Sequence, residues 1–351
     1  MSINLTTKFS DKIDERFSIR SLTDAYAGHN YDFDGAKTVK IYSVDSVPTR
    51  VYTRSGMNRY GNPVELGDTV QELQLTQDRA FTFTVDRGNA SDQMNLKHAA
   101  QRLRVNWDEV VTPEIDRYRL KAWADRCGLG TVRAAALDKT SVLEAIVAAG
   151  SEMSNALVPL DNRVLFIRQS VYTICKLADE IMAIESLGEK SIARGIVGMI
   201  DGTHVVPVPD SWMPAGVNFI IKYRGASVDP MKLKSLRVHS CPPGIDGDLA
   251  ECRYYYDAFV LDKKVCGVYV HAKSGMADMP ALTYDATTHK VTVTSQNNVT
   301  FYYTKDGSDP KTNPAKTAYS GAVTLAEGEV FRVYGELAGG TLKGPIAEMK
   351  Y

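Results

Sequence analysis

The residue types that most often carry out chemistry are present in this chain, but they are scattered along it. The six histidines stand at positions 29, 98, 204, 239, 271 and 289, and none lies beside a serine or cysteine in the context of a catalytic nucleophile. The best local pair of polar groups is Asp201 and His204, in Asp201-Gly-Thr-His204. Because this segment lies between two apolar runs, we expect a hairpin turn there and not a catalytic base.

Metal binding has little support in the sequence. His239 and Cys241 precede Cys252, but structural zinc sites show close pairs of ligands, and no two of the five cysteines have C-x-x-C spacing. Such an odd, unclustered set favours reduced thiols packed as small apolar groups. Asp32-Phe-Asp-Gly35 resembles the opening of a calcium loop but lacks its later ligands, so we expect a plain turn. We expect no metal site and no cofactor.

The common catalytic motifs are also missing from the sequence. It contains no Walker loop, no G-x-G-x-x-G, no H-E-x-x-H and no G-x-S-x-G. We therefore assign no catalytic residue and expect a structural or binding protein that is not an enzyme.

Length and composition bound the remaining possibilities. A chain of 351 residues holds about two domains, and its 44% hydrophobic and 24% charged residues exclude global disorder. The 41 basic and 42 acidic residues leave a net charge of −1, so the basic excess of a protein that condenses nucleic acid is absent. No apolar stretch is long enough for a membrane helix, and charges come too early for a signal peptide. We expect a protein of a bacterial-type cytosol.

Alternation and helical spacing of apolar residues predict the elements that would position any functional surface. Residues 1–38 form a polar arm with balanced charges, and residues 39–86 a long two-stranded hairpin. The return strand of this hairpin carries its apolar residues on one face, with no second layer nearby in sequence to cover them. Another part of the chain or a neighbouring chain must cover that face. The residues are Leu73, Leu75, Phe81, Phe83 and Val85.

The rest of the chain divides into a mixed region and an all-β end. Residues 91–125 show one apolar helical stripe in which Pro113 either kinks the helix or starts a second one. Helices and short strands alternate over residues 140–240, and residues 246–271 are expected to form two strands joined at 262–264. The class is therefore α+β. After about residue 273 only short strands and turns remain, which predicts a separate β-sandwich.

A series of short segments occurs in consistent order over about residues 1–272. Together they resemble the major capsid proteins of tailed bacteriophages that have the Hong Kong 97 fold. The segments are Asp34-Gly-Ala-Lys-Thr-Val-Lys-Ile-Tyr42, Leu75-Thr-Gln-Asp-Arg-Ala-Phe81, Thr112-Pro-Glu-Ile-Asp-Arg-Tyr118, Pro159-Leu-Asp-Asn-Arg-Val-Leu-Phe166, Gly202-Thr-His-Val-Val-Pro-Val-Pro209, Met213-Pro-Ala-Gly-Val-Asn-Phe219, Pro243-Gly-Ile-Asp-Gly-Asp-Leu249 and Tyr255-Tyr-Asp-Ala-Phe259.

The resemblance implies a role for each part. It makes 1–38 the N-terminal arm, 39–86 the E-loop, 87–129 and 231–272 the peripheral domain with its spine helix, and 130–230 the axial domain. It also implies that many copies assemble through pentamers and hexamers into an icosahedral shell around double-stranded DNA. The implied E-loop contacts with a neighbouring subunit are Arg54, Arg59, Tyr60, Leu73, Leu75, Phe81 and Phe83.

Two departures from the family shape the expected partners. Some members crosslink through an E-loop lysine, but residues 41–80 contain only arginines as basic residues, so we expect noncovalent clamping or a cement protein. Family-like sequence begins within about 30 residues of Met1, so we expect a separate scaffolding protein. A portal protein is a further implied partner, assembly in the host bacterial cytoplasm is expected, and the mature location is the virion capsid.

The last part of the chain, residues 273–351, resembles the immunoglobulin-like module at the C-terminus of chitobiases. Phe301-Tyr-Tyr-Thr-Lys-Asp-Gly-Ser-Asp-Pro310 and Tyr319-Ser-Gly-Ala-Val-Thr-Leu325 carry the likeness. It implies a decoration on the outer capsid surface, with glycan adhesion through Tyr302 or Tyr319 as the sharper alternative. Two other identities stay open: an encapsulin-type compartment, and a carbohydrate-binding or carbohydrate-processing protein.

Overall fold

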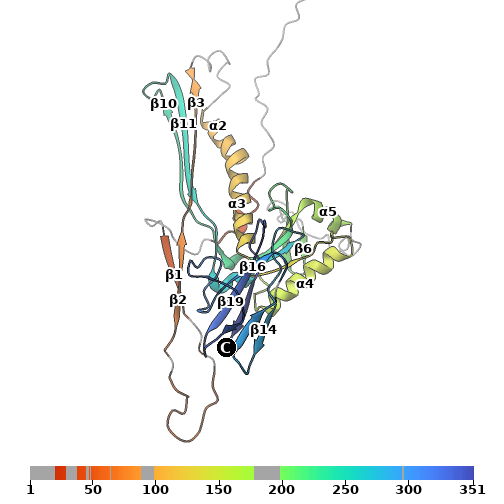
Figure 1. The fold of residues 1–351 in the computed structure, drawn as a ribbon. Coiled ribbons are helices and arrows are strands. Elements are labelled where there is room, and N and C mark those ends of the chain that lie inside the picture. Colours follow the sequence, from red (N-terminus) through yellow and green to blue (C-terminus); the bar gives the residue numbers. More distant parts are fainter. Residues whose placement is uncertain are drawn as a thin grey trace, which may run out of the picture.

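The computed structural model describes residues 20–28, 38–44, 47, 49–63, 65–87, 99–177, 198–294 and 296–351. They form an elongated molecule: a long sheet backed by a helix, a projecting hairpin, a central sheet and a small β-sandwich (Figure 1). The expected α+β class is confirmed. The expectations for the first part of the arm, the calcium-like turn at 32–35 and the start of the long helix concern residues outside the described ranges.

One long helix runs beside the long sheet. It consists of α2 (Ala99–Asn106), a π-helical turn η2 (Trp107–Val111) and α3 (Thr112–Asp125), which follow one another without interruption. Pro113 lies in the first turn of α3. A wider turn directly before the proline accommodates the break in the i→i−4 bonding pattern, so the helix neither ends nor restarts there.

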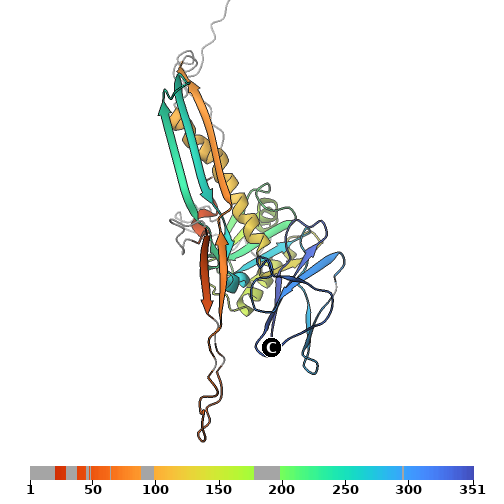
Figure 2. The ribbon, with the colours of Figure 1, turned by 60° about the vertical axis from the view of Figure 1, so that its left-hand side comes forward.

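The long sheet has the antiparallel order β10-β11-β3, with β3 at Gln77–Asp86, β10 at Met231–Ser240 and β11 at Gly247–Tyr256. Its apolar face packs on the helix, where Leu103 and Ile115 meet Cys252 and Tyr254. The expected single hairpin over 39–86 therefore needs correction. Its last ten residues leave the hairpin and pair with β11, far along the chain, and the long helix supplies the missing layer over their apolar face (Figure 2).

The projecting hairpin is shorter than expected, with β1 at Thr38–Val44 and β2 at Asp68–Gln74. Its inner face, together with the following Leu75, is buried against β9 (Ser227–Val228), β12 (Phe259–Val260) and Leu261. The hairpin base is thus covered by its own chain.

The central sheet has six strands in the order β4-β13-β8-β5-β7-β6. The helices α4 (Ser141–Asn155) and α5 (Gln169–Lys176) cover one face, and α3 covers the other. Three 3-10 turns, η1 (Asp24–Tyr26), η3 (Arg224–Ala226) and η4 (Asp262–Gly267), connect elements. The strands are β4 (Leu129–Val132), β5 (Arg163–Arg168), β6 (Gly198–Ile200), β7 (Thr203–Val208), β8 (Val217–Tyr223) and β13 (Val268–Ala272).

Two local expectations have opposite outcomes in this sheet. Asp201 and Gly202 both have positive φ and link the antiparallel strands β6 and β7, so the expected hairpin turn is confirmed, in the geometry that two-residue turns favour. The expected pairing of two strands over 246–271 is wrong. β11 belongs to the long sheet, whereas β13 pairs with β8 and β4 in the central sheet.

The C-terminal region is a β-sandwich of two antiparallel sheets, as expected. Its core includes Val291, Phe301, Phe331 and Val333. One sheet contains β14 (Leu282–Asp285), β15 (Lys290–Val293) and β18 (Val323–Thr324), and the other β17 (Thr317–Ala318), β16 (Val299–Thr304), β19 (Val330–Leu337) and β20 (Ile346–Lys350).

The sandwich is not a separate unit, which corrects the expectation of an independent module. Tyr334, Leu342 and Ile346 are buried in the same apolar cluster as Leu120 and Trp123 of α3. The side chain of Lys311 is also buried, and its Nζ donates to the carbonyl oxygens of Asp125 (3.1 Å) and Cys127 (2.8 Å). These carbonyls lie at the C-terminal end of the long helix, where carbonyl acceptors lack partners within the helix. The lysine of the sandwich therefore caps the helix.

Replacing this lysine tests how far the sandwich stabilises the body. We expect Lys311→Met to lower the free energy of unfolding by about 1–3 kcal/mol, because it keeps the apolar stem but leaves two buried carbonyls without a donor. Urea unfolding measures the difference. Lys290→Met, on an exposed position of β15, is the control, and an equal loss in both variants contradicts the capping role.

Candidate assembly surfaces

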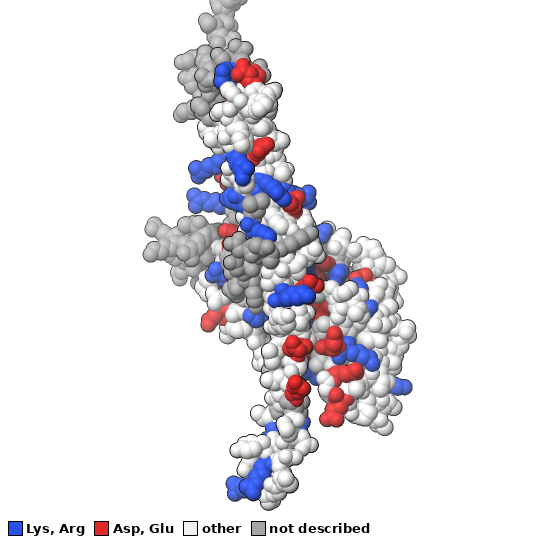
Figure 3. Space-filling model, turned by 90° about the vertical axis from the view of Figure 1, so that its left-hand side faces the viewer, with Lys and Arg blue, Asp and Glu red and all other residues white. Residues whose placement is uncertain are grey.

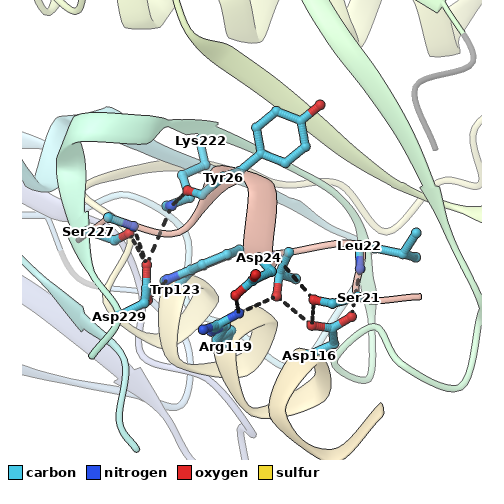
Figure 4. A network of polar contacts seen from close by, with 12 residues as sticks. Ser21, Leu22, Asp24, Tyr26, Asp116, Arg119, Trp123, Lys222, Ser227 and Asp229 are labelled. Atoms are coloured by element: carbon cyan, nitrogen blue, oxygen red, sulfur yellow. Dashed lines mark hydrogen bonds and ion pairs between the residues drawn. The ribbon is translucent and has the colours of Figure 1, made fainter. Parts of the chain in front are cut away.

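A strap formed by residues 20–28 lies across α3 (Figure 4). The fully buried carboxylate of Asp116 accepts hydrogen bonds from Ser21 Oγ (2.8 Å), the Leu22 amide (2.8 Å) and Thr23 Oγ1 (2.6 Å). One helical turn later, Arg119 Nη1 donates to Thr23 Oγ1 (3.2 Å). These bonds hold the polar first part of the strap. At its end Tyr26 and Ala27 are buried, and Tyr26 packs in the apolar cluster between α3 and the central sheet.

A second buried carboxylate, Asp229, holds the end of the strap. It accepts from the Gly28 amide (3.0 Å) and from Trp123 Nε1 (2.8 Å). The buried Lys222 Nζ donates to the Tyr26 carbonyl (2.6 Å) and lies 3.8 Å from Asp229 Oδ2. Burial lowers the pKa of Lys222 to about 8, although the charge of Asp229 opposes this shift.

A third buried carboxylate fixes the corner where the chain leaves the hairpin for the long sheet. Asp257 accepts from the Thr76 amide and Oγ1 (both 2.8 Å) and from Tyr118 Oη of α3 (2.7 Å). Burial, and then this hydrogen bond, raise the pKa of Tyr118 to about 12. The corner, and with it the direction of the hairpin, is therefore tied to the long helix.

The far end of the hairpin combines exposed apolar and basic side chains. Val51, Met57 and Tyr60 are 90%, 95% and 87% exposed, and Arg54 and Arg59 are exposed as well. Contacts within the hairpin end nevertheless hold its local shape. The rings of Tyr52 and Tyr60 meet edge to face at 5.0 Å, the Thr53 amide donates to the Arg59 carbonyl (3.1 Å), and Gly56 turns with φ +88°.

The contact residues named from the sequence do not lie on one surface. Arg54, Arg59 and Tyr60 are on the exposed hairpin end. Leu73 and Leu75 are buried within their own chain, so these two side chains are not available to a neighbour. The rings of Phe81 and Phe83 face the long helix from β3 and pack in its cluster.

Sequence reasoning missed the outer face of the hairpin. Tyr42 and Val70 are directly opposite each other in the β1–β2 ladder, and they are 67% and 50% exposed. With Val44 and Leu66, which are also exposed, they extend the apolar surface of the hairpin end toward the body. The sequence did contain a sign of this surface, because β1 carries apolar residues on both faces.

The other candidate sites do not assemble. His239 and Cys252 point to opposite faces of the long sheet, and His239 Nε2 instead lies 3.4 Å from Glu251. Among the described residues, no three histidines, cysteines or carboxylates are close enough together to hold a metal ion. Nor does any helix in those ranges have the length and apolar character to cross a membrane.

Comparison with solved structures shows the fold. A chain of Mycobacterium phage Che8 matches with a TM-score of 0.61 and 16% identity, over 77% of this chain and 97% of that one. The capsid structure of cyanophage P-SCSP1u matches with a TM-score of 0.60 and 11% identity, over 76% of this chain and 92% of that one. The head structure of Helicobacter pylori bacteriophage KHP40 matches with a TM-score of 0.57 and 8% identity, over 77% of this chain and 95% of that one. The chain therefore has the Hong Kong 97-type capsid fold with an added C-terminal sandwich.

Sequence comparison adds less. The family model described as "Fn3 associated" matches residues 291–342, within the sandwich. No curated protein matches the chain. The match is compatible with an immunoglobulin-like module, and the likeness to chitobiases in particular stays an expectation.

The strap gives a testable prediction. We expect Asp116→Ala to make trypsin cleave after Arg20 at least about tenfold faster, because the loss of even one buried charge-assisted bond costs about 1–3 kcal/mol of local stability. Mass spectrometry of a digestion time course measures the rate. The control is Asp108→Ala, at an exposed position of the same helix. Equal cleavage rates would show that the carboxylate does not hold the strap.

Proposed function

We propose that this protein is the major capsid protein of a tailed double-stranded DNA bacteriophage. One observation carries the proposal: a body with the Hong Kong 97-type fold projects a hairpin end whose apolar and arginine side chains are exposed among the described residues. Val51 and Met57 alone would each contribute about 1.5–3 kcal/mol if a partner covered them fully. A second copy is the partner that the fold supports.

Assembly follows from repeating such a contact. A head-to-tail contact whose rotation closes makes rings, which gives the pentamers and hexamers of the proposed icosahedral shell. Every subunit would make several contacts at once, so each can be modest while the shell remains stable. The role is structural, without catalysis or a cofactor. We extend it to a virion location, assembly in the host cytoplasm, and scaffolding, portal and possibly cement proteins as partners.

The proposed parts follow the sequence boundaries with two changes. The strap belongs to the proposed arm, 1–38, and the hairpin to the proposed E-loop, 39–86, although β3 (77–86) lies in the long sheet with β10 and β11. The peripheral domain is 87–129 with 231–272, except that β13 joins the proposed axial domain, 130–230. Residues 273–351 form the proposed surface domain.

Charge supports the contact and the enclosed genome. Figure 3 shows Lys and Arg at the far end of the hairpin, whereas Asp and Glu gather nearer the body. A basic hairpin end is suited to an acidic surface on another copy. The net charge of −1 suits a shell that encloses DNA without binding many of its phosphates.

The sandwich fits a surface decoration better than a glycan site. Tyr302 stacks on Tyr334 at 5.8 Å and lies under Lys316 Nζ at 4.3 Å. The hydroxyl of Tyr319 accepts a bond from the Val293 amide (2.9 Å), and its ring packs on the sandwich core. Both tyrosines that suggested sugar stacking are engaged in packing.

Reversing charge on the hairpin end tests the proposal. We expect the wild-type chain, expressed alone or with its neighbouring genes, to form closed shells or rings by negative-stain electron microscopy. The double variant Arg54→Glu with Arg59→Glu should stay folded but lose assembly by at least about tenfold, because like charges would meet across the contact. The matched control is Lys290→Glu with Lys350→Glu, at exposed positions of the sandwich.

Each outcome bears on a separate claim. Normal shells from the arginine variant would remove the hairpin end from the contact. A wild-type monomer under every condition would overturn the capsid proposal. Shells filled with a foreign protein, and not DNA, would favour an encapsulin-type compartment.

A further inference from the structure

One turn beside the central sheet combines a strained backbone with an exposed apolar side chain. Residues 156–162 connect α4 to β5, and Leu157 in this turn has φ +59° and is 90% exposed. Left-handed backbone conformations favour glycine and are costly for a residue such as leucine that has a Cβ atom. Leu157 therefore costs stability through its backbone, and its side chain gains little from burial among the described residues.

The hydrogen bonds of the turn show why this conformation is required. The Leu157 amide donates to the Ser154 carbonyl (3.0 Å), and the Val158 amide donates to the Met153 carbonyl (3.0 Å). This pair of bonds ends a helix on one left-handed residue, which is usually glycine. Val158 and Met153 pack in the apolar cluster between α4 and the central sheet. The turn is thus a regular helix end with leucine at the glycine position.

A buried arginine fixes the shape of the turn. The guanidinium of Arg163, a residue that is 2% exposed, donates to the carbonyl oxygens of Pro159 (2.8 Å) and Val158. Its Nη1 donates to the Gly150 carbonyl of α4 (3.1 Å). The exposed leucine is therefore presented on a rigid support, and a contact residue that is already held in place loses less conformational entropy on binding.

The charge of the turn indicates which class of partner fits it. Residues 156–162 carry a single charge, on Asp161, and a second leucine, Leu160, that is 61% exposed. The phosphates of nucleic acids and of anionic lipids bind basic residues, so neither suits this turn. Two exposed leucines on a rigid turn suit an apolar surface on another protein chain.

Another copy of this chain offers such a surface. The central sheet with α4 and α5, here called the central domain, exposes the side chains of Val147, Leu177 and Met199. A head-to-tail contact joins two different surfaces of each subunit. Figure 1 shows α4 and α5 on the opposite side of the molecule from the projecting hairpin, so the central domain and the hairpin end can engage different copies at the same time.

We propose that Leu157 packs against the central domain of an adjacent copy when the protein assembles. The inference rests on the proposed function, because it needs rings of identical subunits. It also explains the strain, since a side chain that is costly in the free subunit contributes to the contact between subunits. Glycine at this position would give a more stable subunit and a weaker assembly, which is the trade-off expected of a residue used for function.

Substitution of Leu157 separates the two effects. Leu157→Gly relieves the backbone, so the urea midpoint of the dilute, unassembled chain should stay equal or rise. The concentration needed to form rings or shells should nevertheless rise by at least about tenfold, because burying one leucine changes an association constant by more than that factor. Leu157→Asn should lose assembly equally, since asparagine tolerates the left-handed conformation. Sedimentation velocity and negative-stain electron microscopy measure assembly.

The matched control is Asn162→Gly. Asn162 lies in the same turn, is exposed and has φ +60°, but it carries no apolar side chain, so this variant should assemble like the wild type. Normal assembly of both Leu157 variants would overturn this inference alone. A wild-type monomer under every condition would overturn it together with the proposed function. A lower urea midpoint for Leu157→Asn would also overturn it, by showing that the chain itself covers the leucine.

Discussion

The unbroken helix from Ala99 to Asp125 is the element on which the rest of the structure depends. Its first half buries Leu103 against the long sheet, and its second half buries Trp123 against the central sheet. The same helix binds the strap through Asp116 and receives Lys311 of the sandwich at its end. Most of the stability of a helix in a protein comes from the packing of its apolar face, so helix and surroundings stabilise one another.

Three buried carboxylates set the geometry around that helix. Asp116, Asp229 and Asp257 each accept at least three hydrogen bonds, and each joins segments that are far apart in sequence. A buried charge is costly unless such donors surround it. The donors therefore have to be in place together, which favours one arrangement of strap, corner and sheet over looser alternatives.

Local patterns in the sequence predicted local structure well. The apolar stripe predicted the helix that includes 99–125, and turn residues predicted the hairpin at Asp201. Alternation also identified the apolar face of β3, which the long helix covers, but it carries no information about which distant strand pairs with β3. The partners of β3 and β13 were for that reason missed.

The candidate surfaces divide in the same way. Arg54, Arg59 and Tyr60, which the family resemblance implied as contacts, lie on the exposed hairpin end, and their contact with a neighbouring subunit stays a prediction. Asp116, Lys222 and Asp229 could not be selected from the sequence, because charged residues are mostly exposed and a sequence does not show which exceptions are buried. The docking of the sandwich was missed for a related reason. Lysine is usually exposed, so the sequence gives no sign that Lys311 is buried against the end of α3.

The hairpin base has a mechanical consequence. Gln71, in the middle of β2, is 9% exposed, and its amide joins the Val260 carbonyl (2.9 Å) and the Asp262 amide (3.2 Å). The hairpin is therefore held by the body at its base, and its far end projects away from the body. A force applied at its free end produces the greatest bending moment at this anchor. The segment that receives the strain is the one from Val260 to Asp262, which also meets the sandwich, so strain on the hairpin and seating of the sandwich converge on the same few peptide bonds.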